Sequence, residues 1–269
     1  MAWGVGAWAL LKLAIFAFYA DVYTSIIKAR FSQTYYLDLF AGPGLNKINE
    51  TGDLILGSPL LADRVPKQGK KFDGMILIEK SREDANALRK LLPNAEVLHR
   101  DVNKDGLEIA LKSIPQNPAC PVLAFVDPEG LEIQWSTLES LLKIWSDVMI
   151  NYQPTSVRRV IGSLKNTPSL ENSLNRYFGG NQWKGCSTDD ELFQLYLSKI
   201  KQHKEVAIPI RVRGSGGFYY YIIVAVRRTG GEQHWIDAVH RAKEKIEAAS
   251  SHDAERFLEI YKGRQQLIG

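Results

Sequence analysis

The stretch YYLDLFAGPG, residues 35–44, decides which fold this chain is expected to adopt. Apolar residues lead into Asp38, and a turn with two glycines around a proline follows almost at once. A buried strand that ends in a carboxylate and breaks into a glycine-rich turn is typical of parallel sheets whose strand ends face a ligand. Gly42 and Gly44 would let the backbone approach that ligand closely, with amides exposed at the turn.

Short apolar runs alternate with amphipathic segments after this turn. The apolar runs predict strands at 74–80, 95–101, 121–127 and 147–153. The amphipathic segments predict helices at 57–65, 81–92, 101–114 and 137–145. Ser58 and Ser81 are suited to cap two of the helices, and Pro59 suits a first helical position. The alternation predicts an α/β fold with a mostly parallel sheet and helices on both faces.

The last third of the chain has a different character. Residues at about 155–205 predict a helical insertion, and 206–212 and 218–228 predict two strands joined by the short link RGSGG. A link this short implies an antiparallel hairpin, which would complete a seven-stranded sheet. A charged helix is expected at roughly 233–249.

The N-terminal run AWGVGAWALLKLAIFAFYA is 19 residues long and carries one charge, at Lys12. Its length and apolarity would allow a membrane span, but a charge in the middle of a span is costly. Because aromatic and apolar residues recur at helical spacing, we favour a helix that packs on the main domain over a membrane anchor. The expected division is an N-terminal helical segment at 1–32, a main domain at 33–245 and a C-terminal helical tail at 246–269.

The amino-acid composition indicates the cellular compartment of the protein and the kind of partner that it binds. The two cysteines lie at unrelated spacing, so they make neither a disulfide framework nor a zinc site and favour a reducing, cytoplasmic location. The net charge of +4 is uneven, because residues 151–269 hold 18 Lys and Arg against 12 Asp and Glu. This excess indicates an anionic partner such as nucleic acid, although a solvated basic face would give the same pattern.

Four of the predicted strands end in an acidic residue: Asp38, Glu79, Asp101 and Asp127. Because ligands bind beyond the carboxyl ends of parallel strands, these side chains are expected to face one crevice. Glu79 could accept hydrogen bonds from two ribose hydroxyls, Asp101 could meet an adenine amino group, and Asp127 would lie nearest the reacting group. The turn lacks a full G-x-G-x-x-G and the chain lacks G-K-[ST], which disfavours nicotinamide cofactors and nucleoside triphosphates.

The motifs LDLFAGPG, LIEK, RD and VDPEG resemble the successive motifs of class I S-adenosylmethionine-dependent methyltransferases. More narrowly, W..LKL, D.FAGPG, GSPL.A, IEK, DPEG, INYQ and YYYIIVA resemble the three-Cys-motif partner proteins, over about residues 8–245. The resemblance implies a Rossmann-like methyltransferase fold with S-adenosylmethionine as cofactor. The residues that it implies around the cofactor are Asp38, Phe40, Ala41, Gly42, Pro43, Gly44, Ser58, Glu79, Lys80, Asp101 and Val102.

DPEG, at 127–130, resembles the Asp/Asn-Pro-Pro-aromatic motif of enzymes that methylate exocyclic amines of bases. In those enzymes an acidic or amide oxygen and a backbone carbonyl orient the amine, so catalysis is mainly orientation. Asp127 and the carbonyl of Pro128 could serve here, and Glu129 could act as a general base. The motif's aromatic residue is missing, and the candidates to stack on a base in its place are Trp135, Tyr152 and Phe40.

The residues expected to contact the substrate lie at the end of the fifth predicted strand and just after it. Asn151 and Tyr152 come after the fifth predicted strand, and Arg158 and Arg159 form a basic segment that could contact phosphates. The long segment 45–57 is expected either to cover the crevice as a lid or substrate contact, or to form a surface hairpin.

Two functions fit these observations. One is an S-adenosylmethionine-dependent methyltransferase that acts on RNA or DNA, at an exocyclic base amine. The alternative is a non-catalytic methyltransferase-like binding module, whose partner is an iron–sulfur or radical-type protein that carries the three-Cys motif. In that case DPEG is only a strand-end turn.

Overall fold

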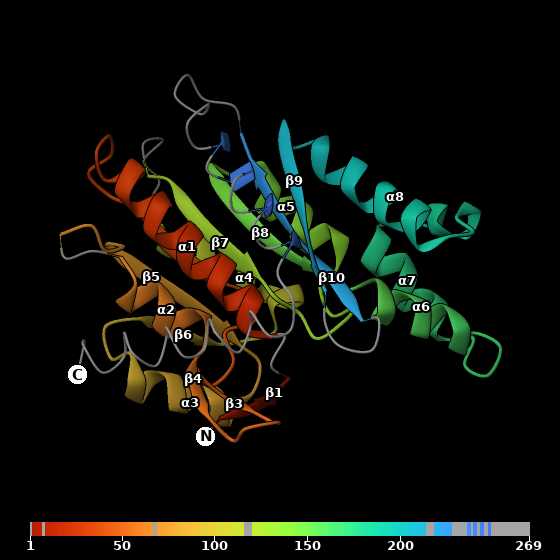
Figure 1. Ribbon diagram of the computed structural model, residues 1–269, viewed down its shortest axis with the longest axis horizontal. Helices are drawn as coiled ribbons and strands as arrows, with labels where there is room; N and C mark the ends of the chain where they lie inside the picture. Colours follow the sequence, from red (N-terminus) through yellow and green to blue (C-terminus); the bar gives the residue numbers. More distant parts are fainter. Residues whose placement is uncertain are drawn as a thin grey trace.

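The computed structural model describes residues 2–6, 9–66, 69–115, 120–213 and 218–227, and eight positions between 236 and 248. Its centre is a seven-stranded sheet with the strand order β6-β5-β2-β7-β8-β10-β9 (Figure 1). In chain order the strands are β2 (Tyr35–Asp38), β5 (Gly74–Glu79), β6 (Glu96–His99), β7 (Val122–Val126), β8 (Ser146–Tyr152), β9 (Val206–Arg213) and β10 (Tyr219–Val226). β10 runs antiparallel to both β8 and β9, and the pairs from β6 to β8 are parallel. The predicted α/β sheet with its C-terminal antiparallel hairpin is confirmed.

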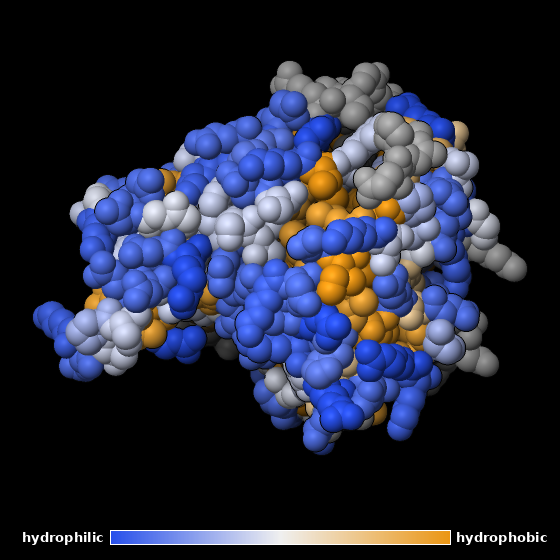
Figure 2. Space-filling view, turned by 180° about the vertical axis from the view of Figure 1, so that it is seen from behind, coloured by the Kyte–Doolittle hydropathy of each residue, from blue (hydrophilic) through white to orange (hydrophobic). Residues whose placement is uncertain are grey.

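Helices cover both faces of this sheet, because successive side chains of each buried strand point to opposite faces and both need apolar cover. One core contains residues of α1 (Ala9–Ile27), α2 (Ser58–Arg64) and α3 (Arg82–Leu91). The other contains residues of α4 (Leu107–Ser113), α5 (Trp135–Lys143), α6 (Pro154–Ser163), α7 (Leu170–Phe178) and α8 (Asp189–Lys201). Seen from behind, the surface is mostly hydrophilic, with an apolar band between two hydrophilic regions (Figure 2).

A second, three-stranded sheet lies beside the first, with the order β1-β3-β4. β3 (Leu45–Ile48) and β4 (Leu54–Leu56) form the antiparallel hairpin that was one of two expectations for 45–57. β1 (Trp3–Val5) pairs parallel with β3 and corrects the prediction of a helix through these residues. Gly4 and Gly6 disfavour a helix there, and β3 offers a pairing edge.

Helix α1 packs on the sheet. It is long and apolar enough to cross a membrane by length and composition, and half of that window is buried inside the protein. Phe16 is fully buried between the rings of Tyr36 and Phe125.

The domain boundaries stay predictions. The expected helix at 233–249 and the expected tail at 246–269 lie largely outside the described residues.

The two expected helix caps have different outcomes. Ser81 caps α3, because its hydroxyl accepts a hydrogen bond from the backbone N–H of Asp84 at 3.3 Å. The cap predicted at Ser58 is wrong: Gly57 is the N-cap of α2 and Ser58 lies in its first turn. Within the described residues, the Ser58 hydroxyl does not accept from a backbone N–H as a cap would. It donates to the carboxylate of Asp38 at 2.7 Å, and hydrogen bonds to a charged acceptor are stronger than those between neutral groups.

Two interacting ionisable residues, the partly buried Asp147 and the buried Lys204, lie at the amino end of β8, at the opposite end of the sheet from the glycine turn. Asp147 accepts a hydrogen bond from the hydroxyl of Tyr19 at 3.2 Å, and burial raises the pKa of its carboxyl to about 7, against the opposing charge of Lys204. Lys204 is itself fully buried, and its Nζ donates to the carbonyl of Ile144 at 3.0 Å.

We expect Asp147→Asn to stabilise the protein above neutral pH. In the unfolded chain this carboxyl loses its proton near pH 4. The folded protein keeps the proton up to about pH 7, so stability falls as the pH rises between these values. The amide of the variant does not ionise in this pH range. We therefore expect the free energy of unfolding of the variant to exceed that of the wild type by roughly 1–3 kcal/mol at pH 8 and to differ little from it at pH 4. Urea unfolding at both pH values measures the two free energies of unfolding. If the stability of the variant falls with rising pH as steeply as that of the wild type, the prediction is wrong.

Candidate functional site

Two adjoining cavities lie at the carboxyl ends of β2, β5, β6 and β7. The large cavity, of about 610 Å³, is enclosed by the glycine turn, the β1-β3-β4 sheet and the starts of α1 and α6. The small cavity, of about 470 Å³, follows the ends of β5 and β6. Trp3, Phe40, Asp127 and Glu129 line both cavities and so form their boundary. Both volumes fall within the roughly 300–1,000 Å³ usual for small-molecule sites.

Asp38 lies beneath the floor of the large cavity. It is fully buried, and its Oδ2 accepts hydrogen bonds from the hydroxyls of Tyr36 at 2.6 Å and Ser58 at 2.7 Å. Its Oδ1 accepts from the backbone N–H of Phe40 at 3.2 Å, and burial raises the pKa of the carboxyl to about 6. Asp38 is not among the described residues that line either cavity. The predicted direct contact between Asp38 and a ligand is therefore corrected. Its role is to hold the turn in place.

The glycine turn forms the wall above Asp38. Gly42 and Gly44 have φ angles of +61° and +84°, a region that side chains with a Cβ rarely adopt. Both line the large cavity together with Phe40 and Ala41, whereas Pro43 is buried and is not among the described lining residues. The indole of Trp3 lies 3.5 Å from where a Cβ on Gly42 would be. The backbone of the turn therefore faces the large cavity under an aromatic cover.

Glu79 joins the turn to the small cavity. Its Oε2 accepts from the backbone N–H of Gly42 at 2.8 Å and its Oε1 from that of Ser81 at 2.6 Å. The side chain is only 6% exposed, and burial raises its pKa. Lys80, Asp101 and Val102 line the same cavity, and their predicted contact with a cofactor stays a prediction. There the ammonium of Lys80 lies 3.3 Å from the carboxylate of Asp101.

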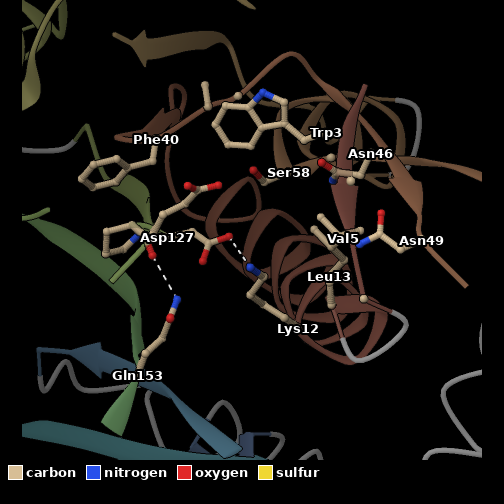
Figure 3. A pocket seen from close by; sticks show the side chains of 18 of the residues that line it. Trp3, Val5, Lys12, Leu13, Phe40, Asn46, Asn49, Ser58, Asp127 and Gln153 are labelled. Carbon is tan, nitrogen blue, oxygen red and sulfur yellow. Dashed lines mark hydrogen bonds and ion pairs between the residues drawn. The ribbon is translucent and has the colours of Figure 1, made fainter. Parts of the chain in front are cut away.

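Asp127 stands at the boundary, and both of its oxygens have partners. Oδ1 accepts from Nδ2 of Asn151 at 2.7 Å. Oδ2 lies 2.5 Å from Nζ of Lys12, on the first turn of α1 (Figure 3). The carbonyl of Pro128 accepts from Nε2 of Gln153 at 3.1 Å. The DPEG strand end is therefore a hydrogen-bonded assembly, and Glu129 lines both cavities beside it.

Several expected substrate residues lie elsewhere. Tyr152 is fully buried, and its ring packs on Phe193 and Tyr196 in the core on the far face of the sheet, so the prediction that it lines the substrate side is wrong. Trp135 is also buried, with its ring against Tyr196, and cannot stack on a base. Of the three aromatic candidates, Phe40 lines both cavities.

The other predicted substrate residues divide into three roles. Asn151 is 2% exposed and orients Asp127 from behind without being among the described lining residues. Arg158 forms an ion pair with Asp189, and Arg159 is exposed and lines the large cavity.

Sequence reasoning missed Trp3, Lys12 and Gln153 as residues of the site, whereas for 45–57 it left open a contact with the crevice and a surface hairpin. Asn46, Asn49 and Glu50 of the 45–57 segment line the large cavity, so this segment is both a hairpin and a wall of the site. The signal for Lys12 was present in the sequence: it is the single charge in a 19-residue apolar run.

Comparison with protein-family models and with curated proteins found no match. Among solved structures, protein LPL1258 from Legionella pneumophila superposes with a TM-score of 0.55 at 14% identity, over 88% of this chain and 92% of that one. The plantazolicin methyltransferase BpumL in complex with SAH gives a TM-score of 0.41 at 14% identity, over 90% and 81%. The plantazolicin methyltransferase BamL, with a desmethylPZN analog and SAH, gives 0.40 at 12%, over 93% and 78%. The likeness to the Legionella protein shows a shared fold.

We expect Gly44→Ala to destabilise the protein by about 1–2 kcal/mol, because a Cβ disfavours this positive φ. The added atom would also lie 3.0 Å from a methyl group of Leu88. Gly162→Ala is the matched control: Gly162 lies in α6 with no described atom within 4 Å of its Cβ position. It should gain roughly 0.5–1 kcal/mol from helix propensity. Urea midpoints compare the two, and equal effects would show that the turn is not constrained.

Proposed function

We propose that this chain is an S-adenosylmethionine-dependent methyltransferase. The observation that carries the proposal is the hydrogen bond from Gly42 to Glu79, which joins a glycine turn and a buried strand-end acid around one crevice that also contains Asp127. In sheets of this kind, ligands bind outside the carboxyl ends of the strands.

The residues present fit this cofactor. Each oxygen of Glu79 has one hydrogen-bond donor, and a carboxylate can accept about four, so capacity remains for ribose hydroxyls. Asp101 and Val102 would hold the adenine in the small cavity, and the backbone of Gly42 and Gly44 would hold the amino-acid end in the large one. When bound, the cofactor supplies an electrophilic methyl group.

The acceptor that we propose is an exocyclic amine of a nucleic-acid base. Asp127 and the carbonyl of Pro128 would each accept a hydrogen bond from the amine and so orient its lone pair. Phe40 would stack on the base, and Glu129, at the junction of the cavities, would take the proton that the amine loses. Arg159 at the large cavity and the basic 151–269 segment favour a phosphate backbone, of RNA or DNA.

One observation favours a second candidate, the non-catalytic binding module. Both oxygens of Asp127 are already engaged, by Asn151 and Lys12, as they would be in a strand end that is purely structural. Its partner would be the protein with the three-Cys motif to which the sequence resemblance points. A cytoplasmic location fits both candidates and stays a prediction from the cysteine content.

We expect Glu79→Ala to weaken the binding of S-adenosylmethionine by about 10- to 100-fold, since hydrogen bonds to a charged group contribute roughly 1.5–3 kcal/mol. Isothermal titration calorimetry measures the affinity, and circular dichroism checks the fold. Glu83→Ala, an exposed acid in the first turn of α3, is the matched control and should bind as the wild type does. A wild-type protein that does not bind the cofactor would refute the proposal.

We expect Asp127→Ala to lower methyl transfer by at least about 100-fold while cofactor affinity stays within a factor of a few. Transfer of tritium from methyl-labelled S-adenosylmethionine to total RNA and to DNA measures the activity. Equal labelling by variant and wild type would remove Asp127 from the mechanism. If the wild type binds the cofactor and labels neither nucleic acid, the result favours the binding module.

A further inference from the structure

The geometry points to Lys12 and Asp127 as a pair that reads the edge of the acceptor base, selecting adenine or cytosine and rejecting guanine. This inference rests on the proposed methyltransferase function and deepens it, because it names the substrate class. It assigns to the helix α1 a side chain that touches substrate.

The pair lies within the site. Nζ of Lys12 and Oδ2 of Asp127 are 2.5 Å apart, and both residues line the large cavity (Figure 3). Their side chains are 13% and 19% exposed, so each is largely shielded from bulk water but open to the cavity. Hydrogen bonds in such a setting are stronger than at the surface. A molecule that enters the cavity would meet an ammonium donor next to a carboxylate acceptor.

Such a pair is complementary to an amine that neighbours an unprotonated ring nitrogen. Adenine presents the N6 amine beside the N1 acceptor, and cytosine presents the N4 amine beside the N3 acceptor. In each case the carboxylate of Asp127 would accept from the amine while the ammonium of Lys12 donates to the ring nitrogen. The amine to be methylated is then fixed by two hydrogen bonds in one plane.

Guanine presents a different pattern on its Watson–Crick edge, where the N2 amine neighbours a protonated N1. A carboxylate with both oxygens free would bind these two donors bidentately. Each oxygen of Asp127 already accepts from one donor, Asn151 at Oδ1 and Lys12 at Oδ2. A bidentate pair would place one guanine donor at each oxygen, so the donor at Oδ2 would lie beside the Lys12 ammonium. The ammonium of Lys12 would then face the N1–H, donor against donor. Uracil and thymine have no exocyclic amine.

A second ion pair, at the opposite end of α1 from Lys12, provides a matched control. Lys28 follows α1 and lies 2.7 Å from the carboxylate of Asp73, with side-chain exposures of 15% and 31%. Neither residue is among the described residues that line the two cavities. Removing that ammonium perturbs the packing of the N-terminal helix in a comparable way without touching the site.

The test compares the wild type with Lys12→Met, Lys12→Arg and Lys28→Met. Tritium transfer is measured on homopolymeric adenine, cytosine, guanine and uracil RNA, and on the DNA equivalents. We expect the wild type to label the adenine or the cytosine polymer. Lys12→Met should lower kcat/KM on that polymer by about 10- to 100-fold, as for the loss of one base contact, and should reduce the preference over guanine. Lys12→Arg should keep the preference, and Lys28→Met should match the wild type.

Calorimetry with S-adenosylmethionine separates the possible failures. If the wild type labels guanine first, if Lys12→Met keeps the wild-type base preference, or if no polymer is labelled although the cofactor binds, the inference is overturned and the cofactor assignment stands. A tenfold or greater loss of cofactor affinity in Lys12→Met would also overturn it, since Lys12 would then belong to the cofactor site. A wild type that binds no cofactor removes the proposed function, and this inference with it.

Discussion

The buried carboxylate of Asp38 is the constraint on which the site depends. A carboxylate with no access to water must be satisfied by internal donors, and here they come from three separate elements: the Tyr36 hydroxyl on β2, the backbone of Phe40 in the turn and the Ser58 hydroxyl on α2. This fixes where the turn begins and where α2 starts. With the turn held in this position, the N–H of Gly42 donates to Glu79. The residues beneath the large cavity therefore also position Glu79, which lines the small one.

The fold and the location of the site could be predicted from local patterns. Strands ending in Asp38, Glu79, Asp101 and Asp127 were recognisable because buried parallel strands are apolar throughout and their carboxyl ends share one edge. The error at Tyr152 has a simple geometric cause. Neighbouring residues on a strand point to opposite faces, so Asn151 and Tyr152 could not both face the crevice. Tyr152 faces away from Asp127, where aromatic residues of α7 and α8 cover it, and Asn151 reaches Asp127 from behind.

The rest of the site depends on packing between distant elements. Lys12 was visible as an isolated charge, but its partner is determined by how α1 crosses the sheet above β7. Trp3 covers the glycine turn only because β1 pairs with β3, and a three-residue strand beside glycines carries almost no local signal. The hydroxyl of Ser58 could either accept from a backbone N–H as a helix cap or donate to a carboxylate, and sequence alone does not show that Asp38 is within reach.

The pairing of Lys12 with Asp127 also bears on how the chain folds. The two residues lie far apart in the sequence, and β7 takes its place only between β2 and β8, which themselves are distant in the chain. Contacts of this kind require large loops to close and form late and slowly. The crevice would therefore be completed near the end of folding, after the sheet has been ordered. A molecule that binds there stabilises only the finished state, so it would slow unfolding and leave the rate of folding nearly unchanged.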